Sequence, residues 1–143
     1  MRLKKMLFLM GVLILGVGCR LFQPQSLQPQ ATSPLEPLPN EASLSRGDVI
    51  ISSTDLLVME SDPLQIALQI EGTLPTPCHK LRVDLNKPDD QNRIVIEAYS
   101  LADPNENCIQ VIEPFEENIP LGSYPDGSYT VILNGEKVGD FTQ

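Results

Sequence analysis

The sequence predicts an all-β domain over residues 48–143, arranged as an antiparallel β-sandwich of seven to eight short strands. Short apolar runs alternate with turn signals roughly every 8–15 residues along this stretch. Within several runs, apolar and polar side chains alternate at period two, which is typical of strands with one buried face. No stretch of helical length carries apolar residues at helical spacing. A small barrel is the alternative all-β architecture.

The alternation is most regular in residues 64–70 and 81–85. The pair Asn134-Gly135 favours a two-residue hairpin turn between the last two strands. Pro125-Asp126-Gly127 indicates a turn just before them. The full set of expected strands covers residues 48–51, 56–59, 64–70, 81–85, 94–99, 109–112, 129–133 and 138–141.

Residues 126–131, followed by the Asn134-Gly135 hairpin, resemble the last two strands of bacterial immunoglobulin-like domains. The resemblance implies an immunoglobulin-like sandwich. It places Tyr129 at the position of a structural tyrosine whose hydroxyl bonds nearby backbone. The chain departs from antibody domains because it has no tryptophan and no cysteine two residues beyond Tyr129.

The N-terminus has the three parts of a secretory signal, which we assign to residues 1–18. Arg2, Lys4 and Lys5 form a positive region, and residues 7–17 form an uncharged apolar run. This run is shorter than the ~20 residues that an ordinary transmembrane helix needs. Gly16 and Gly18 are small residues of the kind that a signal peptidase accepts.

The run ends in Leu15-Gly16-Val17-Gly18-Cys19, which resembles the lipobox of bacterial lipoproteins. The resemblance implies that the Cys19 thiol carries a fatty-acyl anchor such as palmitate. The protein would then be exported and held on the cell membrane or outer membrane, facing the periplasm or exterior. Gly16 stands where the family usually has leucine. An uncleaved anchor and a plain secreted protein are the alternatives.

Residues 19–47 are rich in proline and glutamine and predict an extended linker between the lipidated cysteine and the domain. The alternative is a linker that docks on the domain through Leu35 and Leu38. Removing residues 1–18 removes three of the 10 Lys and Arg residues and no Asp or Glu, so the net charge falls from −9 to −12. An anionic membrane surface would repel such a domain, so we expect it to be tethered and held off.

Cys78 and Cys108 both adjoin expected strands, and an exported protein meets oxidising conditions. We therefore predict a disulfide between them, with two free thiols as the alternative. Together with His79 they offer at most three metal ligands, so we expect no metal site.

Composition excludes some classes of function. A net charge of −9 and a pI near 4.4 argue against nucleic-acid binding. His79 could act as a base beside Ser52 or Ser100, but no spacing supports catalysis, and we expect neither an enzyme nor a cofactor. The acidic stretches 84–92, 103–107 and 113–118 are expected to be solvated loops, because the first lacks the pattern of a calcium loop.

Phe115 and Tyr124 lie on expected loops and are candidate partner contacts. For Phe115 we favour a place in the core, and for Tyr124 the surface. Arg46-Gly47-Asp48 spells an adhesion tripeptide, a three-residue match that chance readily produces. The leading hypothesis is an anchored module that binds an unknown protein or peptide partner. The alternatives are a structural envelope lipoprotein without a saturable ligand and an enzyme with an unrecognised site.

Overall fold

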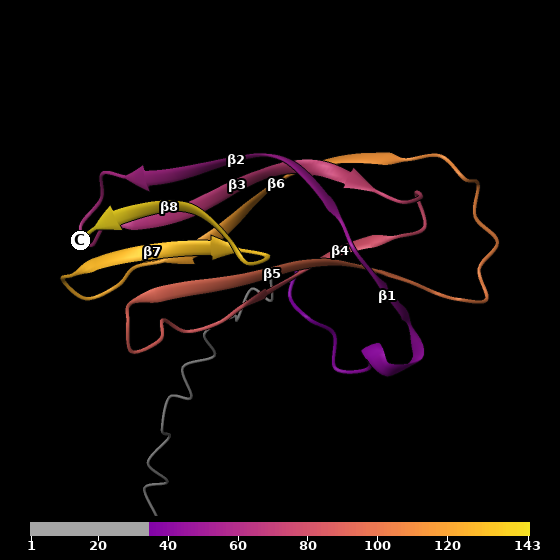
Figure 1. The fold of residues 1–143 in the computed structure, drawn as a ribbon, viewed down its shortest axis with the longest axis horizontal. Coiled ribbons are helices and arrows are strands. Elements are labelled where there is room, and N and C mark those ends of the chain that lie inside the picture. The colour runs from indigo at the N-terminus through magenta and orange to yellow at the C-terminus, as the bar shows by residue number, and fades with distance from the viewer. Residues whose placement is uncertain (1–34) are drawn as a thin grey trace, which may run out of the picture. The chain divides into compact units, whose positions relative to one another are not determined.

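The computed structural model describes residues 35–143, which form a β-sandwich with two facing sheets (Figure 1). The predicted all-β sandwich is therefore confirmed. The predictions for residues 1–34, including the signal segment and Cys19, lie outside the described residues. The elements are a 3-10 helix η1 (Glu41–Ser43) and the strands β1 (Ser45–Gly47), β2 (Ile50–Met59), β3 (Gln65–Leu74), β4 (Lys80–Leu85), β5 (Arg93–Ala102), β6 (Glu113–Gly122), β7 (Ser128–Leu133) and β8 (Glu136–Thr142).

The smaller sheet holds three antiparallel strands in the order β2-β3-β6, which lie along the upper side of Figure 1. The larger sheet holds β1, β4, β5, β7 and β8. Ile96 of β5 pairs with both Leu85 of β4 and Leu133 of β7, so β4 and β7 lie on opposite edges of β5. β1 lies on the same edge as β7, because Ser100 pairs with both Gly47 and Leu81.

One strand pair departs from the expected antiparallel arrangement. β5 and β7 pair in parallel, with Arg93 opposite Thr130 and Ile96 opposite Leu133. Between them the chain crosses to the smaller sheet as β6 and then returns. The chain reverses direction once between β5 and β6 and again between β6 and β7. After two reversals β7 has the same direction as β5, so the two strands run parallel.

The core lies between the sheets and is formed by residues of both of them. Ile66, Leu68 and Ile70 of β3 are almost fully buried, as are Ile94 and Ile96 of β5. Their polar neighbours point outward, which is the period-two pattern of a half-buried strand. Burial of each such side chain contributes about 1.5–3 kcal/mol relative to exposure.

The domain begins earlier than the expected boundary at Asp48. The backbone N–H of Val83 in β4 donates to the Leu35 carbonyl over 2.7 Å, and β1 pairs with β5. Leu35 is buried in the core, whereas Leu38 is 42% exposed. The docking alternative is thus correct for Leu35, whose backbone bonds to β4 while its side chain fills the core, and wrong for Leu38.

Two further expectations are wrong. Residues 109–112 form a loop instead of a strand, and the acidic stretch 113–118 lies in β6 instead of a loop. In β6, Phe115, Ile119 and Leu121 point inward and Glu117 on the same face is half-buried, while Pro114, Glu116, Asn118 and Pro120 are exposed. Pro114 and Pro120 are tolerated because β6 is an edge strand, where a missing N–H breaks no ladder. Within residues 35–143, no helix is long and apolar enough to cross a membrane.

Candidate functional site

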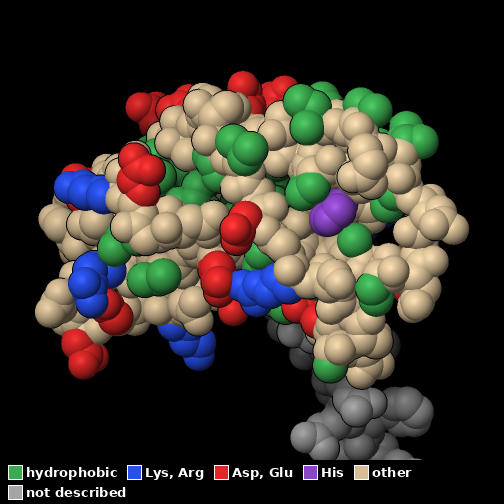
Figure 2. Space-filling view, turned by 45° about the vertical axis from the view of Figure 1, so that its right-hand side comes forward, with side chains coloured by type: hydrophobic (Ala, Val, Ile, Leu, Met, Phe, Trp, Pro, Cys, Tyr) green, Lys and Arg blue, Asp and Glu red, His purple; other side chains and the backbone are tan. Residues whose placement is uncertain are grey.

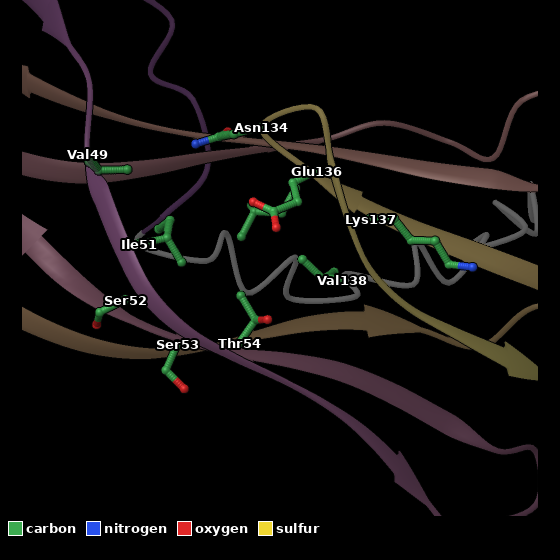
Figure 3. Close-up of a pocket in the computed structure, with 10 residues that line it drawn as sticks. Val49, Ile51, Ser52, Ser53, Thr54, Asn134, Glu136, Lys137 and Val138 are labelled. Atoms are coloured by element: carbon green, nitrogen blue, oxygen red, sulfur yellow. The ribbon is translucent and has the colours of Figure 1, made fainter.

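A groove lies on one open side of the sandwich, between β2 at the edge of the smaller sheet and β8 at the edge of the larger sheet (Figure 3). Its volume is about 450 Å³. Neither facing edge pairs with a further strand among the described residues, so backbone groups of both edges border the groove. It is lined by Val49, Ile51, Ser52, Ser53, Thr54, Leu133, Asn134, Glu136, Lys137 and Val138.

The two edges meet where Leu56 of β2 packs on Gly139 of β8. A Cβ placed on Gly139 would lie 2.9 Å from Leu56 Cδ2, so only glycine permits this approach without a shift. The pairing of β2 with β3 slips between Ile51 and Ser53, which marks a bulge beside the groove. The groove therefore opens on the Val49 and Asn134 side of the Leu56–Gly139 contact.

Apolar and polar groups are mixed inside the groove. Figure 3 shows Ile51, Thr54 and Val138 pointing into it, with the Glu136 carboxylate at its rim and Lys137 pointing away. Lys137 forms an ion pair with Asp140 over 2.7 Å. Lys137 and a hydrogen bond from Thr130 hold the pKa of the Asp140 carboxyl below its usual value. The groove thus combines an apolar floor with hydroxyl groups and one carboxylate.

The predicted Asn134-Gly135 hairpin forms the end of the groove. Both residues have positive φ, 49° and 86°, as a type I′ turn requires. The Asn134 side chain also bonds the backbone of Ala98: Nδ2 donates to its carbonyl over 3.0 Å, and Oδ1 accepts its N–H over 2.8 Å. These two bonds fix the hairpin to β5. Because Glu136 directly follows the hairpin, its position at the rim is also fixed.

Residues 68–143, from β3 to the end of the chain, match the family described as the ORF11 beta-sandwich domain. The chain belongs to this family. A relative from Herpetosiphon aurantiacus, the uncharacterized 10.2 kDa protein in HgiCIIM 5'region, is 31% identical over 87 residues. The alignment covers 60% of this chain and 92% of the relative. No solved structure matches the chain.

The ORF11 domain contains the predicted disulfide. Cys78, between β3 and β4, is bonded to Cys108 in the loop between β5 and β6, and the Cys78 N–H donates to Cys108 Sγ over 3.2 Å. Next to it, His79 Nδ1 lies 2.8 Å from the Thr76 hydroxyl, within the same turn. In residues 35–143, no cluster of three or more His, Cys, Asp or Glu residues could hold a metal ion.

The two serine hydroxyls considered as partners of His79 form hydrogen bonds to other residues. Ser52 donates to the carbonyl of Glu71, and the fully buried Ser100 donates to the carbonyl of Asp48. The structure thus brings neither serine into a hydrogen bond with His79. The hydroxyl it does place there, on Thr76, was missed by sequence reasoning and belongs to a local turn.

Tyr129 bonds local backbone as the resemblance implied, because its hydroxyl donates to the carbonyl of Pro125 over 3.1 Å. Its ring stacks on Phe141, with centroids 5.2 Å apart. Tyr124 joins this cluster at 5.1 Å from Tyr129 and donates its hydroxyl to the Leu121 carbonyl. Tyr124 is therefore half-buried against the core, and the surface position favoured for it is wrong. Phe115, on β6, also packs against the core.

Two polar motifs of the chain are engaged in its own structure. In the loop 84–92, Asp89 accepts hydrogen bonds from Arg93, which lower the pKa of its carboxyl to about 2. In the Arg46-Gly47-Asp48 tripeptide, the Arg46 guanidinium lies 3.6 Å from the centre of the Tyr99 ring and pairs with Glu97. The arginine of the tripeptide is thus held on the sheet.

Proposed function

We propose that this protein is a membrane-anchored surface lipoprotein whose β-sandwich binds an extended segment of a protein or peptide. The groove between β2 and β8 is the observation that carries the proposal. An extended segment in this groove can extend the β2 edge by main-chain hydrogen bonds, while alternate side chains contact the apolar floor. Such binding needs no catalytic group.

The chemistry of the groove favours a polypeptide over a small apolar ligand. Its lining includes Ser53 and Thr54 of β2, beside backbone donors and acceptors that pair with no further strand among the described residues. Main-chain groups of a partner strand would satisfy these donors and acceptors in sequence. The Glu136 carboxylate at the rim favours a neutral or basic segment over an acidic one.

The anchor rests on the lipobox resemblance of residues 15–19, and the immunoglobulin-like character of the fold rests on the C-terminal hairpin. The hydrogen bond from Tyr129 to the Pro125 carbonyl supports that likeness. In this proposal Cys19 carries the lipid, residues 20–34 span the distance from the membrane, and the sandwich presents its groove to the partner.

The groove is tested by adding one positive charge to it. Thr54→Lys places an ammonium group beside the β2 edge, which opposes pairing of a further strand. Gln91→Lys, on an exposed loop away from the groove, adds the same charge and serves as the control. Partners are measured as crosslinked adducts of the full chain in native membranes.

We expect a discrete adduct with the unaltered chain and with Gln91→Lys, and its loss with Thr54→Lys. Equal adducts from both variants would overturn the groove as the binding site. If no adduct forms with any of the three chains while deletion of the protein damages the cell envelope, the structural lipoprotein is the correct function instead.

A further inference from the structure

The loop between β5 and β6 exposes large apolar side chains that the groove does not use. Ile109, Val111 and Ile112 are 68%, 55% and 66% exposed. Pro114 follows at the start of β6, and Ile50 lies on the same outer face, because Thr73 pairs with both Ile50 and Pro114. Ile50 is 69% exposed. We call these five residues the loop patch. Single exposed apolar residues are ordinary, but a contiguous group marks an interaction surface.

The loop patch is held in place without burying its own side chains. Cys108, directly before Ile109, is bonded to Cys78, which ties the loop to the turn between β3 and β4. At its other end the chain enters β6, whose pairing with β3 begins at Glu113 opposite Leu74. A loop that is fixed at both ends loses less conformational entropy when it binds a partner. The loop patch is therefore preorganised for binding.

The stretch of chain that carries the loop patch is acidic, while His79 and Lys80 follow Cys78, to which the disulfide ties the loop. No Lys, Arg or His lies between Arg93 and Lys137, a stretch that includes Asp103, Glu106, Glu113 and Glu116. The three strands of the smaller sheet carry no Lys or Arg, so all six described Lys and Arg residues lie on the larger sheet or its loops. In Figure 2, the side on which the β5–β6 loop comes forward shows hydrophobic side chains, with Lys and Arg confined to the left and centre of the view.

Three kinds of partner could cover the loop patch: a lipid surface, a second copy of this chain, or another protein. The charge of the patch and its neighbours distinguishes between them. An anionic lipid surface would be repelled by the acidic rim. A second copy would carry the same rim, and three of the six Lys and Arg residues within residues 35–143, namely Arg46, Arg93 and Lys137, already form ion pairs with acids of their own chain. A partner with basic groups around an apolar centre complements both features of the surface.

We propose that the loop patch docks a basic, apolar segment of a partner protein. The contact buries Ile109, Val111 and Ile112 under apolar side chains of the partner, while its Lys or Arg residues lie near Glu113 and Glu116. This inference shares with the proposed function only the idea of a polypeptide partner. It uses a different surface, so either can fail without the other.

The test measures binding of a fluorescent Lys-Leu repeat peptide to the full chain in micelles of an uncharged detergent. Lys-Ser and Glu-Leu repeat peptides separate charge from apolar contact. The double variant Val111→Ser, Ile112→Ser removes apolar groups from the patch. Its control, Val58→Ser, Met59→Ser, alters side chains that are 48% and 46% exposed elsewhere on β2. A second double variant, Glu113→Gln with Glu116→Gln, removes two negative charges beside the patch. Its control, Asp90→Asn with Asp126→Asn, removes two negative charges elsewhere on the surface.

We expect the Lys-Leu peptide alone to bind, with Kd raised at least about tenfold by the patch variant and less than about twofold by its control. The charge variant and a rise in salt from about 50 to about 500 mM should both weaken binding. The groove variant Thr54→Lys should leave it unchanged. Equal effects of patch and control variants, or equal binding of the Lys-Ser peptide, would overturn the proposal. Binding to phosphatidylcholine vesicles that the patch variant abolishes would overturn it in favour of a lipid surface.

Discussion

The Tyr99 hydroxyl donates to the carboxylate of Glu41, 3.0 Å from Oε1 and 2.9 Å from Oε2. This bond joins the 3-10 helix η1, in the segment expected to be a linker, to β5 in the sheet. Arg46 of β1 lies over the face of the same ring. The ring and hydroxyl of one tyrosine thus hold much of the segment that precedes β2.

Replacing Tyr99 with phenylalanine removes the bond to Glu41 and keeps the ring under Arg46. A hydrogen bond to a charged acceptor contributes about 1.5–3 kcal/mol, so we expect Tyr99→Phe to lower the free energy of unfolding by about 2 kcal/mol. Urea denaturation of both proteins at neutral pH measures the difference. A change under about 0.5 kcal/mol would show that the contact adds little to stability.

The same residue predicts a loss of stability at high pH. Burial, and then the hydrogen bond to Glu41 and its charge, raise the pKa of Tyr99 from 10.0 to about 12. The unfolded chain therefore loses this proton first, and stability that is fully present below pH 10 declines as the pH rises towards 12. The stability advantage over Tyr99→Phe should shrink by about 2 kcal/mol across this window. An unchanged difference between the two proteins would contradict the raised pKa.

The Cys78–Cys108 disulfide spans a sequence separation of 30 residues. In the chain-entropy description, losing a closure of this length lowers the free energy of unfolding by about 3–4 kcal/mol. We expect the double variant Cys78→Ser, Cys108→Ser to show this loss in denaturant titrations. Mass analysis after alkylation is the independent measurement, and two alkylated cysteines at these positions in the native protein would contradict the bond.

Gly72 and Gly139 should tolerate alanine to different degrees. A Cβ on Gly72 would collide with the backbone carbonyl of Ile50 and lie 2.7 Å from Phe115 Cζ, whereas a Cβ on Gly139 meets only the Leu56 side chain, which can move. We expect Gly72→Ala to cost about 3 kcal/mol and Gly139→Ala about 1 kcal/mol. Thermal unfolding of the two variants provides the comparison, and a larger loss for Gly139→Ala would reverse the assignment.

Asn134 supplies both a turn conformation and two hydrogen bonds to Ala98. Asn134→Gly keeps the positive φ and removes the side-chain bonds, while Asn134→Ala removes the bonds and adds backbone strain. We expect losses of about 1–2 kcal/mol for glycine and about 1 kcal/mol more for alanine. Chemical denaturation of both variants separates the two contributions, and equal losses would assign the whole effect to the side-chain bonds.

Cys19→Ser tests the anchor. If the lipobox resemblance holds, the unaltered chain incorporates labelled palmitate and sediments with membranes, and the variant does neither. The double variant Cys78→Ser, Cys108→Ser is the control, since it removes the two cysteines that are joined in the disulfide and should keep the label. Label on the Cys19→Ser protein would overturn the lipoprotein assignment.

The sequence by itself determined the fold class, the core strands β3, β4 and β5, the C-terminal hairpin and the disulfide. The alternation of apolar and polar residues in 64–70 and 81–85 indicates which side chains are buried. Asn134-Gly135 indicates a turn through its local backbone preference. Neither inference needs knowledge of contacts far along the chain. The tertiary structure decided what depends on partners far along the chain. Residues 109–112 look like a strand but have no neighbour to pair with, because their loop leaves the sheet edge and is tied at Cys108. Residues 113–118 look like a loop but lie beside β3, which supplies the missing hydrogen bonds. The groove likewise forms because β2 and β8 are the edge strands of the two sheets and face each other. No local sequence pattern encodes this relation between two sheet edges.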